Sequence, residues 1–311
     1  MSFFAKKPLP IYLSLSAKEW DEKIQKSKEL ASPCILCGRR CLADRSPTSE
    51  KAGKGICQTR DKAVLASAGP HFGEEPPLVG KRGSGTIFFS GCNLKCIFCQ
   101  NYDIAHLNSG QEISDEELAR VMLRIQNMGC HNLNLVSPTH VVPNIVAALR
   151  LAVQEGLKIP IVYNTGGYDS LETVKMLDEI VDIYMPDMKY GEPEPAREYS
   201  QAESYPYVNF EAVQEMHRQV GDLVLDESGL ALHGLLVRHL VLPENMAGTK
   251  KVMDFIARKI SRNTYVNIMA QYRPCYQAEE HPVLGRKIKK SEYLEAVKIA
   301  KDAGLTRVQE L

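Results

Sequence analysis

The chain has 311 residues, of which 44% are hydrophobic and 24% are charged, a composition that excludes a disordered or collagen-like protein. Lysine plus arginine and aspartate plus glutamate each number 38, and there is one tryptophan, which argues against nucleic acid or an anionic membrane as the main partner. No apolar run approaches the roughly 20 residues of a membrane span. The N-terminal charges follow a very short apolar patch, the reverse of a signal peptide, so we expect a cytoplasmic protein.

Residues 1–80 differ from the rest of the chain. They contain one expected helix, over 17–30, followed by a cysteine-rich stretch with few strand signals. From residue 81 to residue 311, short apolar stretches alternate with amphipathic ones that repeat hydrophobic residues at helical spacing. We therefore predict a small metal-binding N-terminal region at 1–80 and an α/β core at 81–311.

The core contains six expected strands, and five of them precede a clear helix. The strands are 86–90, 132–136, 159–164, 182–185, 235–242 and 265–269. The first helix begins after Ser114, which forms a capping-box pattern with Glu117, and ends near Gly129. The other helices are expected over 141–155, 171–181, 249–260 and 291–303.

A long interruption separates the fourth expected strand from the fifth, at about 190–234. It contains a candidate hairpin over 223–232, and it is interpreted either as a lid or as an elaborated crossover. Strands that are apolar throughout suit a parallel sheet buried on both faces. The predicted fold is therefore α/β, a (β/α)6-type partial TIM barrel, with a doubly wound sheet as the alternative.

Seven of the nine cysteines fall within 34–99, and three of them directly follow the first core strand. Cys92, Cys96 and Cys99 have the spacing C-x3-C-x2-C, in a loop that a β/α barrel places on its catalytic face. Three thiolates on one loop can hold three irons of a cubane [4Fe–4S] cluster and leave the fourth iron open. A zinc site with a distant ligand and buried structural cysteines are the alternatives, whereas a ferredoxin would supply a fourth nearby thiolate.

This motif, with Phe98 directly before Cys99, resembles that of the radical S-adenosylmethionine (radical SAM) superfamily. Residues 30–305 resemble its branch related to pyruvate formate-lyase activating enzymes. The resemblance implies a [4Fe–4S] cluster, S-adenosyl-L-methionine (SAM) on the open iron, and reductive cleavage of SAM to a 5′-deoxyadenosyl radical that takes hydrogen from a substrate. It also implies flavodoxin or ferredoxin as electron donor, and a protein glycine, another protein or peptide, or a small metabolite as substrate.

The resemblance extends to residues at the ends of several strands. Ser137 and Thr139 stand where the activating enzymes have a Gly-Gly-Glu sequence that binds the SAM amino group, and their oxygens can accept hydrogen bonds from an ammonium. Lys189 matches a lysine that contacts the SAM carboxylate or ribose. Phe98 is also assigned to the cofactor site on this basis.

Four further residues match positions that hold a monovalent cation beside SAM. They are Asn164, Thr165, Met185 and Asp187, and Asn164 replaces an acid of the family, which weakens the expected cation site. Arg238 and Gln271 match positions that line the SAM pocket. An arginine within an apolar strand is costly to bury unless it is paired, which favours a functional role for Arg238.

The N-terminal region carries a second cysteine group. Cys34, Cys37 and Cys41 have the spacing C-x2-C-x3-C, and Cys57 follows sixteen positions later. Four thiolates suggest a closed site that holds either structural zinc or a second iron–sulfur cluster, and the spacing does not choose between them. Disulfides are not expected in a reducing compartment.

Two other classes of protein remain as alternatives. A non-catalytic iron–sulfur carrier or sensor would bind clusters without cleaving SAM, but it needs no SAM pocket at the strand ends. A zinc-stabilised nucleic-acid binder is disfavoured by the neutral net charge. The leading hypothesis is a radical SAM enzyme, with the glycyl-radical activating enzymes as the nearest functional comparison.

Overall fold

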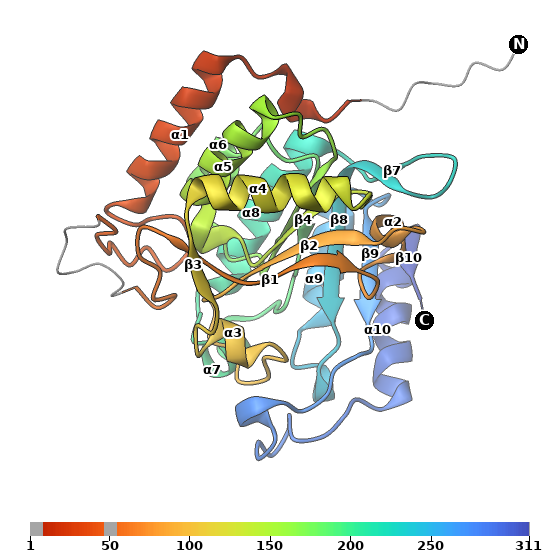
Figure 1. Cartoon of the computed structure of the whole chain (residues 1–311). Coiled ribbons are helices and arrows are strands. Elements are labelled where there is room, and N and C mark those ends of the chain that lie inside the picture. Colours follow the sequence, from red (N-terminus) through yellow and green to blue (C-terminus); the bar gives the residue numbers. More distant parts are fainter. Residues whose placement is uncertain (1–8, 47–54, 311) are drawn as a thin grey trace, which may run out of the picture.

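Seven parallel strands form the centre of the computed structural model, which describes residues 9–46 and 55–310 (Figure 1). Their order in the described sheet is β10-β9-β8-β6-β5-β4-β2, so the chain adds each parallel strand on the same side of the previous one. A doubly wound sheet would reverse direction at a switch point, and this sheet does not. The strands are β2 Ser84–Phe89, β4 Leu133–Val136, β5 Ile161–Thr165, β6 Ile183–Pro186, β8 Ala231–Leu240, β9 Tyr265–Met269 and β10 Arg307–Gln309.

The six predicted strands are confirmed, and the sheet is an open, partial barrel. β10 lies at one edge and the short strand β3, Gln111–Ile113, at the other, so the sheet does not close on itself. β10 was not predicted because three half-buried residues carry no periodic signal. The predicted hairpin is confirmed by β7, Val224–Leu225, which pairs antiparallel with β8.

One strand lies in the region where few strand signals were seen. β1, Ala63–His71, pairs antiparallel with β2 and with β3, so its hairpin with β2 crosses the boundary that we expected at residue 80. Its sequence, AVLASAGPH, is rich in small residues, and most of its side chains are half-buried. A strand without clean alternation of apolar and polar residues leaves no signal in the sequence.

Helices cover the outer face of the sheet (Figure 1). Ser114 and Glu117 form the predicted capping box at the start of α4, and Ser16 and Glu19 form another at α1. The helix predicted over 171–181 is shorter, because α6 ends at Met176. The helices are α1 Ala17–Ala31, α2 Pro76–Val79, α3 Tyr102–Ala105, α4 Asp115–Asn127, α5 Val142–Gln154, α6 Leu171–Met176, α7 Pro193–Ser200, α8 Tyr205–Val220, α9 Thr249–Phe255 and α10 Lys290–Asp302.

The interruption at 190–234 is an elaborated crossover and contains two helices that we did not predict. α7 and α8 connect β6 to the β7–β8 hairpin. Pro193 and Pro206 lie in the first turns of these helices, where proline is tolerated because the N–H groups there have no partner within the helix. Read without the structure, these prolines indicate a loop rather than a helix.

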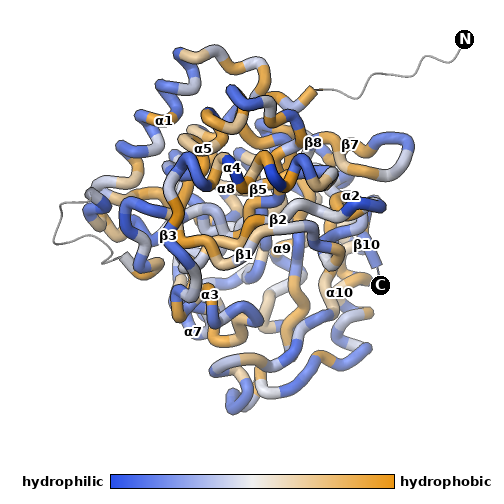
Figure 2. Tube along the Cα trace, viewed as in Figure 1, coloured by the Kyte–Doolittle hydropathy of each residue, from blue (hydrophilic) through white to orange (hydrophobic). Residues whose placement is uncertain are grey.

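The two faces of the sheet have different side chains. Outward-facing residues such as Ile87, Leu135 and Tyr163 are fully buried and belong to the main hydrophobic cluster. Each such side chain contributes roughly 1.5–3 kcal/mol when it leaves water. The tube of Figure 2 alternates between hydrophobic and hydrophilic along α4, as expected of a helix that packs one face against the sheet. Inward-facing residues near the carboxyl ends of the strands include Asn164 and Arg238, which are polar. The polar lining of the barrel therefore concentrates where a β/α barrel places its active site.

His239 lies on the outer face of β8, opposite to Arg238, and is fully buried. Its Nδ1 is 2.7 Å from the Met188 carbonyl oxygen and its Nε2 is 2.9 Å from Thr249 Oγ1. Burial lowers the pKa of His239 to about 4. The side chain is therefore a neutral packing histidine at neutral pH.

This histidine predicts a loss of stability in mild acid. An unfolded histidine titrates near pH 6.5, so stability is present above that pH and is lost as the pH falls toward the folded pKa of about 4. Between pH 7 and pH 5 the loss due to His239 is about 2 kcal/mol. Urea unfolding at both pH values should show a smaller pH effect in His239→Gln than in the wild type. The exposed His233→Gln should behave like the wild type, and equal pH effects in all three proteins would contradict the prediction.

Candidate active site

A cavity of about 420 Å³ lies inside the barrel and reaches the carboxyl ends of its strands. Residues from the cysteine loop and from six parallel strands or the loops that follow them line it, which is the arrangement expected of an active site. Ten of the predicted site residues lie on its wall: Cys92, Cys96, Phe98, Cys99, Ser137, Asn164, Asp187, Lys189, Arg238 and Gln271. The fold therefore brings together most of the residues that the sequence analysis selected.

The cysteine loop begins at Gly91, directly after β2. Gly91 has a φ of +86°, and a Cβ there would lie 2.8 Å from the carbonyl oxygen of Cys57. This position requires glycine for two reasons. Residues with a side chain rarely adopt a φ of this sign, and a Cβ would clash with the Cys57 carbonyl oxygen. The loop is held further by α7, since the Ile97 N–H donates to the Tyr199 carbonyl at 2.9 Å.

The three thiols of this loop have surroundings that fit an iron–sulfur cluster. Cys92 Sγ accepts the Leu94 N–H at 3.4 Å, and Cys96 Sγ accepts the Ser200 hydroxyl at 3.0 Å. Within residues 9–46 and 55–310, no three His, Cys, Asp or Glu side chains are close enough to hold a single metal ion. A cubane has no such requirement, because each thiolate binds a different iron. The loop thus has three spaced thiols, and the sulfur atoms of two of them accept a hydrogen bond. This arrangement fits a cluster that keeps one iron open.

The pKa values of two of these thiols also bear on metal binding. Burial raises the pKa of Cys92 to about 11 and that of Cys99 to about 12, and the neighbouring thiols add to both shifts. Both groups are therefore protonated at neutral pH when no metal is bound. Binding of iron must displace these protons, as it does whenever thiols become metal ligands.

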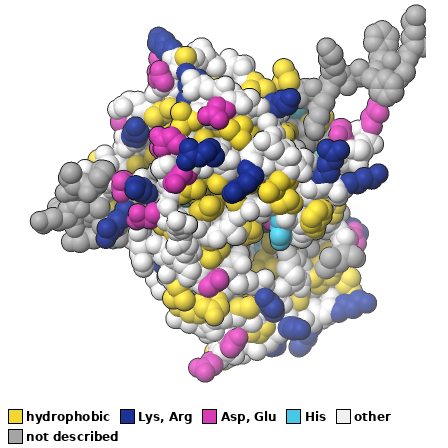
Figure 3. All heavy atoms as spheres, viewed as in Figure 1, with side chains coloured by type: hydrophobic (Ala, Val, Ile, Leu, Met, Phe, Trp, Pro, Cys, Tyr) yellow, Lys and Arg dark blue, Asp and Glu magenta, His cyan; other side chains and the backbone are white. Residues whose placement is uncertain are grey.

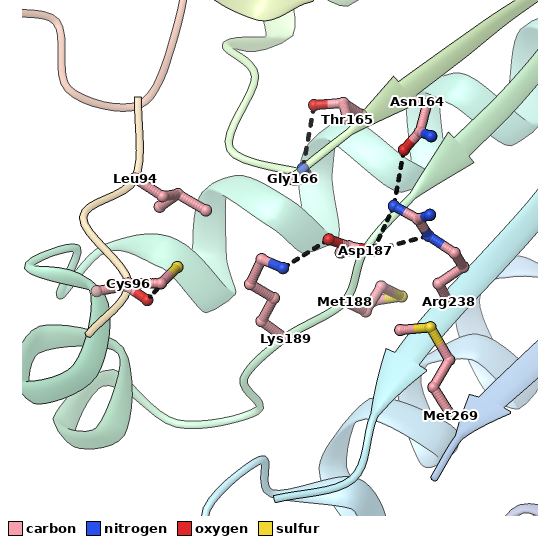
Figure 4. A network of polar contacts seen from close by, with 12 residues as sticks. Leu94, Cys96, Asn164, Thr165, Gly166, Asp187, Met188, Lys189, Arg238 and Met269 are labelled. Carbon is pink, nitrogen blue, oxygen red and sulfur yellow. Dashed lines mark hydrogen bonds and ion pairs between the residues drawn. The ribbon is translucent and has the colours of Figure 1, made fainter. Parts of the chain in front are cut away.

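Opposite the cysteine loop, one carboxylate lies between two cations (Figure 4). Arg238 Nε donates to Asp187 Oδ1 at 2.8 Å, and Lys189 Nζ is 2.5 Å from Asp187 Oδ2. Arg238 Nη2 donates to Asn164 Oδ1 at 2.7 Å. Burial by itself would raise the pKa of Asp187, but Arg238 and Lys189 hold it below its ordinary value. Arg238 is therefore buried as a paired group, as predicted.

This network differs from the cation site suggested by the resemblance. The oxygens of Asn164 and Asp187, which were expected to bind a monovalent cation, accept hydrogen bonds from Arg238 and Lys189. The network has one net positive charge, from two cations and one carboxylate. It is therefore suited to an anionic group such as the SAM carboxylate.

Two residues that were predicted for the SAM and cation sites do not line the cavity. Thr139 and Thr165 are almost fully buried behind the strands, with their Oγ1 atoms 3.2 Å apart. Thr165 Oγ1 donates to Asp169 Oδ2 at 2.6 Å, and Tyr163 donates to the other oxygen of that carboxylate. Successive side chains of a strand point to opposite faces, so Asn164 points into the barrel and Thr165 points away from it. Thr139, which was expected at the SAM amino group, and Thr165, which was expected at the cation, therefore both lie away from the cavity wall.

Several residues on the cavity wall were not predicted. His71 and Glu74 come from the end of β1 and the loop after it, and Met269 comes from β9. Ser200, whose hydroxyl contacts Cys96, comes from α7, and it is linked to Tyr190 by a 2.7 Å hydrogen bond. β1 and α7 were both missed in the sequence, so no local signal connected these residues with the site.

The N-terminal cysteines also converge. A Cβ built on Gly55 would lie 3.1 Å from Cys41 Sγ and 3.8 Å from Cys57 Sγ, so these two sulfurs face the same point. Arg45 Nη2 is 3.5 Å from Cys57 Sγ. Burial raises the pKa of Cys37 to about 12, and its neighbouring thiols add to that shift. Cys34, Cys37, Cys41 and Cys57 are thus neighbours, although no three of these described thiols are close enough to hold a single metal ion.

The second cysteine group packs against the first. Arg39, between Cys37 and Cys41, donates from Nε to the Asn93 carbonyl at 2.9 Å and from Nη2 to the Ser200 carbonyl at 3.0 Å. The Cys57 carbonyl faces Gly91, the residue before Cys92. The N-terminal region therefore contacts the loop that carries the first group of thiols.

An open β/α barrel with three cavity-facing thiols after its first parallel strand defines a class of metal-cluster enzyme. Residues 86–256 match the family profile described as the radical SAM superfamily. This span is more than half of the chain, and the chain belongs to the radical SAM superfamily. Membership implies a [4Fe–4S] cluster and SAM as cofactors, and reductive cleavage of SAM as the underlying chemistry.

The chain is also similar to individual proteins. It is 30% identical to an uncharacterised protein of Methanocaldococcus jannaschii over 92% of this chain and 79% of that protein. It is 39% identical to the pyruvate formate-lyase-activating enzyme of Clostridium pasteurianum over 18% of this chain and 24% of that enzyme. A crystal structure of a radical SAM methyltransferase from Sphaerobacter thermophilus is 15% identical, with a TM-score of 0.48 over 72% of this chain and 66% of the other. Within the described ranges, no helix has the length and hydrophobicity to cross a membrane.

The Ser200 hydroxyl predicts a measurable effect on the cluster. A hydrogen bond to a cysteine sulfur stabilises the more negative, reduced form, so its removal should make the reduction potential more negative. We expect Ser200→Ala to shift the midpoint potential of the reconstituted cluster in that direction without loss of iron. The midpoint potential is measured by a redox titration that is monitored by electron paramagnetic resonance. Ser204→Ala, which removes a hydroxyl bonded to Tyr168 instead, should leave the potential unchanged, and equal potentials in all three proteins would contradict the prediction.

Proposed function

We propose that this chain binds SAM across its cavity, generates a 5′-deoxyadenosyl radical there, and uses it to take hydrogen from a protein or peptide substrate. The observation that carries the proposal is the convergence of the thiols of the cysteine loop and the Asn164, Asp187, Lys189 and Arg238 network on one cavity. When bound, the cluster and SAM supply the one-electron chemistry. The chain supplies the binding site, the orientation and the exclusion of water.

The residues on the cavity wall can be given roles. Lys189 and Arg238 carry the excess positive charge, so they are positioned to receive the SAM carboxylate. Ser137 has a φ of +55°, an uncommon conformation for a residue other than glycine, and it lines the cavity beside Asn164. We assign it to the amino group of SAM. Phe98 and Gln271 line the same cavity and are assigned to the nucleoside.

A glycyl-radical activating role is the finer form of this proposal. It is supported by the cysteine motif and by the short similarity to a pyruvate formate-lyase-activating enzyme. In that case the substrate is a glycine of another protein, and flavodoxin or ferredoxin is the electron donor. An electron carrier or sensor that uses the same cluster without cleaving SAM is the alternative.

We also propose that the N-terminal cysteines hold a second iron–sulfur cluster, with zinc as the alternative. The contacts of Arg39 with Asn93 and Ser200 support a role linked to the first cluster, because they join the two cysteine groups physically. Metal analysis of the anaerobically reconstituted protein distinguishes the two. A zinc-free protein with about eight irons supports two clusters, whereas four irons and one zinc support the alternative.

The proposed activity is tested by SAM cleavage under anaerobic conditions. Reconstituted protein is mixed with SAM and dithionite, and 5′-deoxyadenosine and methionine are quantified by chromatography. We expect equimolar products that depend on the reductant and on the cluster. Absence of both products from a cluster-loaded, SAM-bound protein would favour the carrier or sensor.

A further inference from the structure

Two neighbouring carboxylates lie inside the barrel, far from the cysteine loop. Glu74 and Glu75 belong to the segment between β1 and α2, and both side chains are at least nine-tenths buried. His71, three residues earlier than Glu74, pairs with Ser84 at the amino end of β2, whereas the cysteine loop follows the carboxyl end of that strand. Six residues of β2 separate the two ends, a distance of roughly 17 Å.

The same cavity reaches both ends. His71 and Glu74 line it together with Cys92 and Cys99, so a molecule in the cavity can contact Glu74 while it faces the cluster loop. Glu75 is the next residue in the chain and is buried beside this wall. Leu78 of α2 is fully buried in an apolar cluster with Val162 and Leu236, and this cluster closes the barrel beyond the carboxylates. The acidic pair therefore marks the inner end of the cavity.

Two buried acceptors at this end have no hydrogen-bond donor. Glu75 Oε1 is 3.2 Å from Asn267 Nδ2, but Glu75 Oε2 is buried without a partner. The Asn134 amide donates to Ser84 Oγ at 3.2 Å, and its Oδ1 is also buried without a partner. Asn134 is two residues before Val136, which lines the cavity, so both side chains lie on the inner face of β4. A buried acceptor left unpaired costs about 1–3 kcal/mol, which a donor from a ligand would recover.

The charges at this end are also unbalanced. Asp187 accepts hydrogen bonds from Lys189 Nζ and from Arg238 Nε. The distance from Arg238 Nη1 to Glu75 Oε1 is 3.9 Å, which is too long for a hydrogen bond. Glu74 has His71 as its nearest partner, at 3.3 Å. Asp187 neutralises one of the two permanent cations, and the proposed function assigns the other to the SAM carboxylate. Glu74 and Glu75 are then left without a permanent cation in the absence of histidine protonation. Burial raises the pKa of Glu74 and the neighbouring Glu75 adds to the shift, whereas the charge of Arg238 opposes it without cancelling it.

We propose that the substrate of this site presents a positively charged nitrogen, an ammonium or a guanidinium, to Glu74 and Glu75. The inference rests on the proposed function, because it takes the cavity to be the place where the substrate meets SAM. Such a cation would pair with Glu74 on the cavity wall, and it would bring N–H groups toward Glu75 Oε2 and Asn134 Oδ1, which lack donors. Phe88 and Met269 also line the cavity, and they can pack against an aliphatic stem. A lysine or arginine side chain, or a small aliphatic amine, has this combination of stem and charge.

The test uses three probes of matched size with the anaerobically reconstituted, SAM-bound protein. Isothermal titration calorimetry compares n-butylammonium chloride, n-butanol and sodium butyrate. We expect the ammonium to bind at least tenfold more tightly than the alcohol, and the carboxylate not to bind. Glu75→Gln and Glu74→Gln should each weaken ammonium binding by at least tenfold. Glu112→Gln, an exposed glutamate on β3, should bind all three probes like the wild type.

Equal binding of the ammonium and the alcohol by the wild type would overturn the inference. Unchanged ammonium binding in both glutamine variants, each shown by circular dichroism to be folded, would also overturn it. SAM cleavage is measured on the same wild-type samples, so the two proposals can fail separately. Selective ammonium binding without SAM cleavage refutes the proposed function alone, whereas SAM cleavage without ammonium selectivity refutes this inference alone.

Discussion

Cys96→Ala will lower 5′-deoxyadenosine production to the background level, a loss of at least about 10³-fold, because the protein then lacks one of three thiolates for the cluster. Cys96 is buried in the cavity wall, and Ser200 directs a hydroxyl at its sulfur. An alanine removes both the ligand and the acceptor of that hydrogen bond. Chromatography of the nucleoside, with iron and sulfide analysis of the same sample, measures the effect.

The matched control is Cys130→Ala. Cys130 is also buried, but it lies in the connection between α4 and β4 and packs in the main hydrophobic cluster. We expect this variant to keep its iron and its 5′-deoxyadenosine production. A Cys96→Ala protein with full iron content and normal SAM cleavage would refute the assignment of the cysteine loop to the cluster.

Asp187→Asn is expected to have the second large effect. The change leaves Arg238 and Lys189 buried with no carboxylate between them, and breaking a buried ion pair from one side costs roughly 3–5 kcal/mol. The free energy of unfolding from urea titration should fall by that amount. SAM cleavage should fall by about 10²-fold or more, because Arg238 and Lys189 lose the group that orients them.

Asp178→Asn provides the control for this prediction. Asp178 Oδ2 is 2.6 Å from Arg218, but that arginine is 58% exposed, so the pair lies at the surface. A surface pair contributes about 0–1 kcal/mol, and its loss should not affect SAM cleavage. Equal destabilisation by the two substitutions would show that the Asp187 network is no more important than a surface ion pair.

The space-filling view is consistent with this distinction between surface and interior charges. Acidic and basic side chains are interspersed over the visible face, and no side of that face is dominated by one sign (Figure 3). This agrees with the formal net charge of zero. The charges expected to act on ligands are those inside the barrel, where the low dielectric strengthens them.

Much of the core was predictable because its signals are local. The six core strands and the capping box at α4 follow from hydrophobic periodicity and from residues three positions apart. The cysteine motif is local for the same reason, since Cys92, Cys96 and Cys99 lie on one loop after one strand. The pairing of Arg238 was also predictable, because an arginine in an apolar strand needs a partner when it is buried.

Other features were missed because their signals are weak or misleading. β1 was not predicted because its small residues give no strand pattern. α7 and α8 were not predicted because prolines in their first turns indicate a loop. Thr139 was assigned to the SAM amino group, and Thr165 to the cation site, by resemblance. The strand alternation instead turns Thr165 toward Asp169, behind the sheet. The alternation was visible in the sequence, but the assignment by resemblance did not use it.

The sequence by itself determined the class of fold, the thiols of the cysteine loop and most of the cavity wall, because each depends on short stretches of chain. Only the tertiary structure decided which groups meet across the barrel. Glu75 lies near Arg238 although 163 sequence positions separate them. Ser200 donates a hydrogen bond to Cys96 although 104 sequence positions separate these two residues. Such contacts depend on how β1 and α7 pack against the parallel strands. Packing of this kind is set by burial of the whole apolar surface rather than by any local pattern.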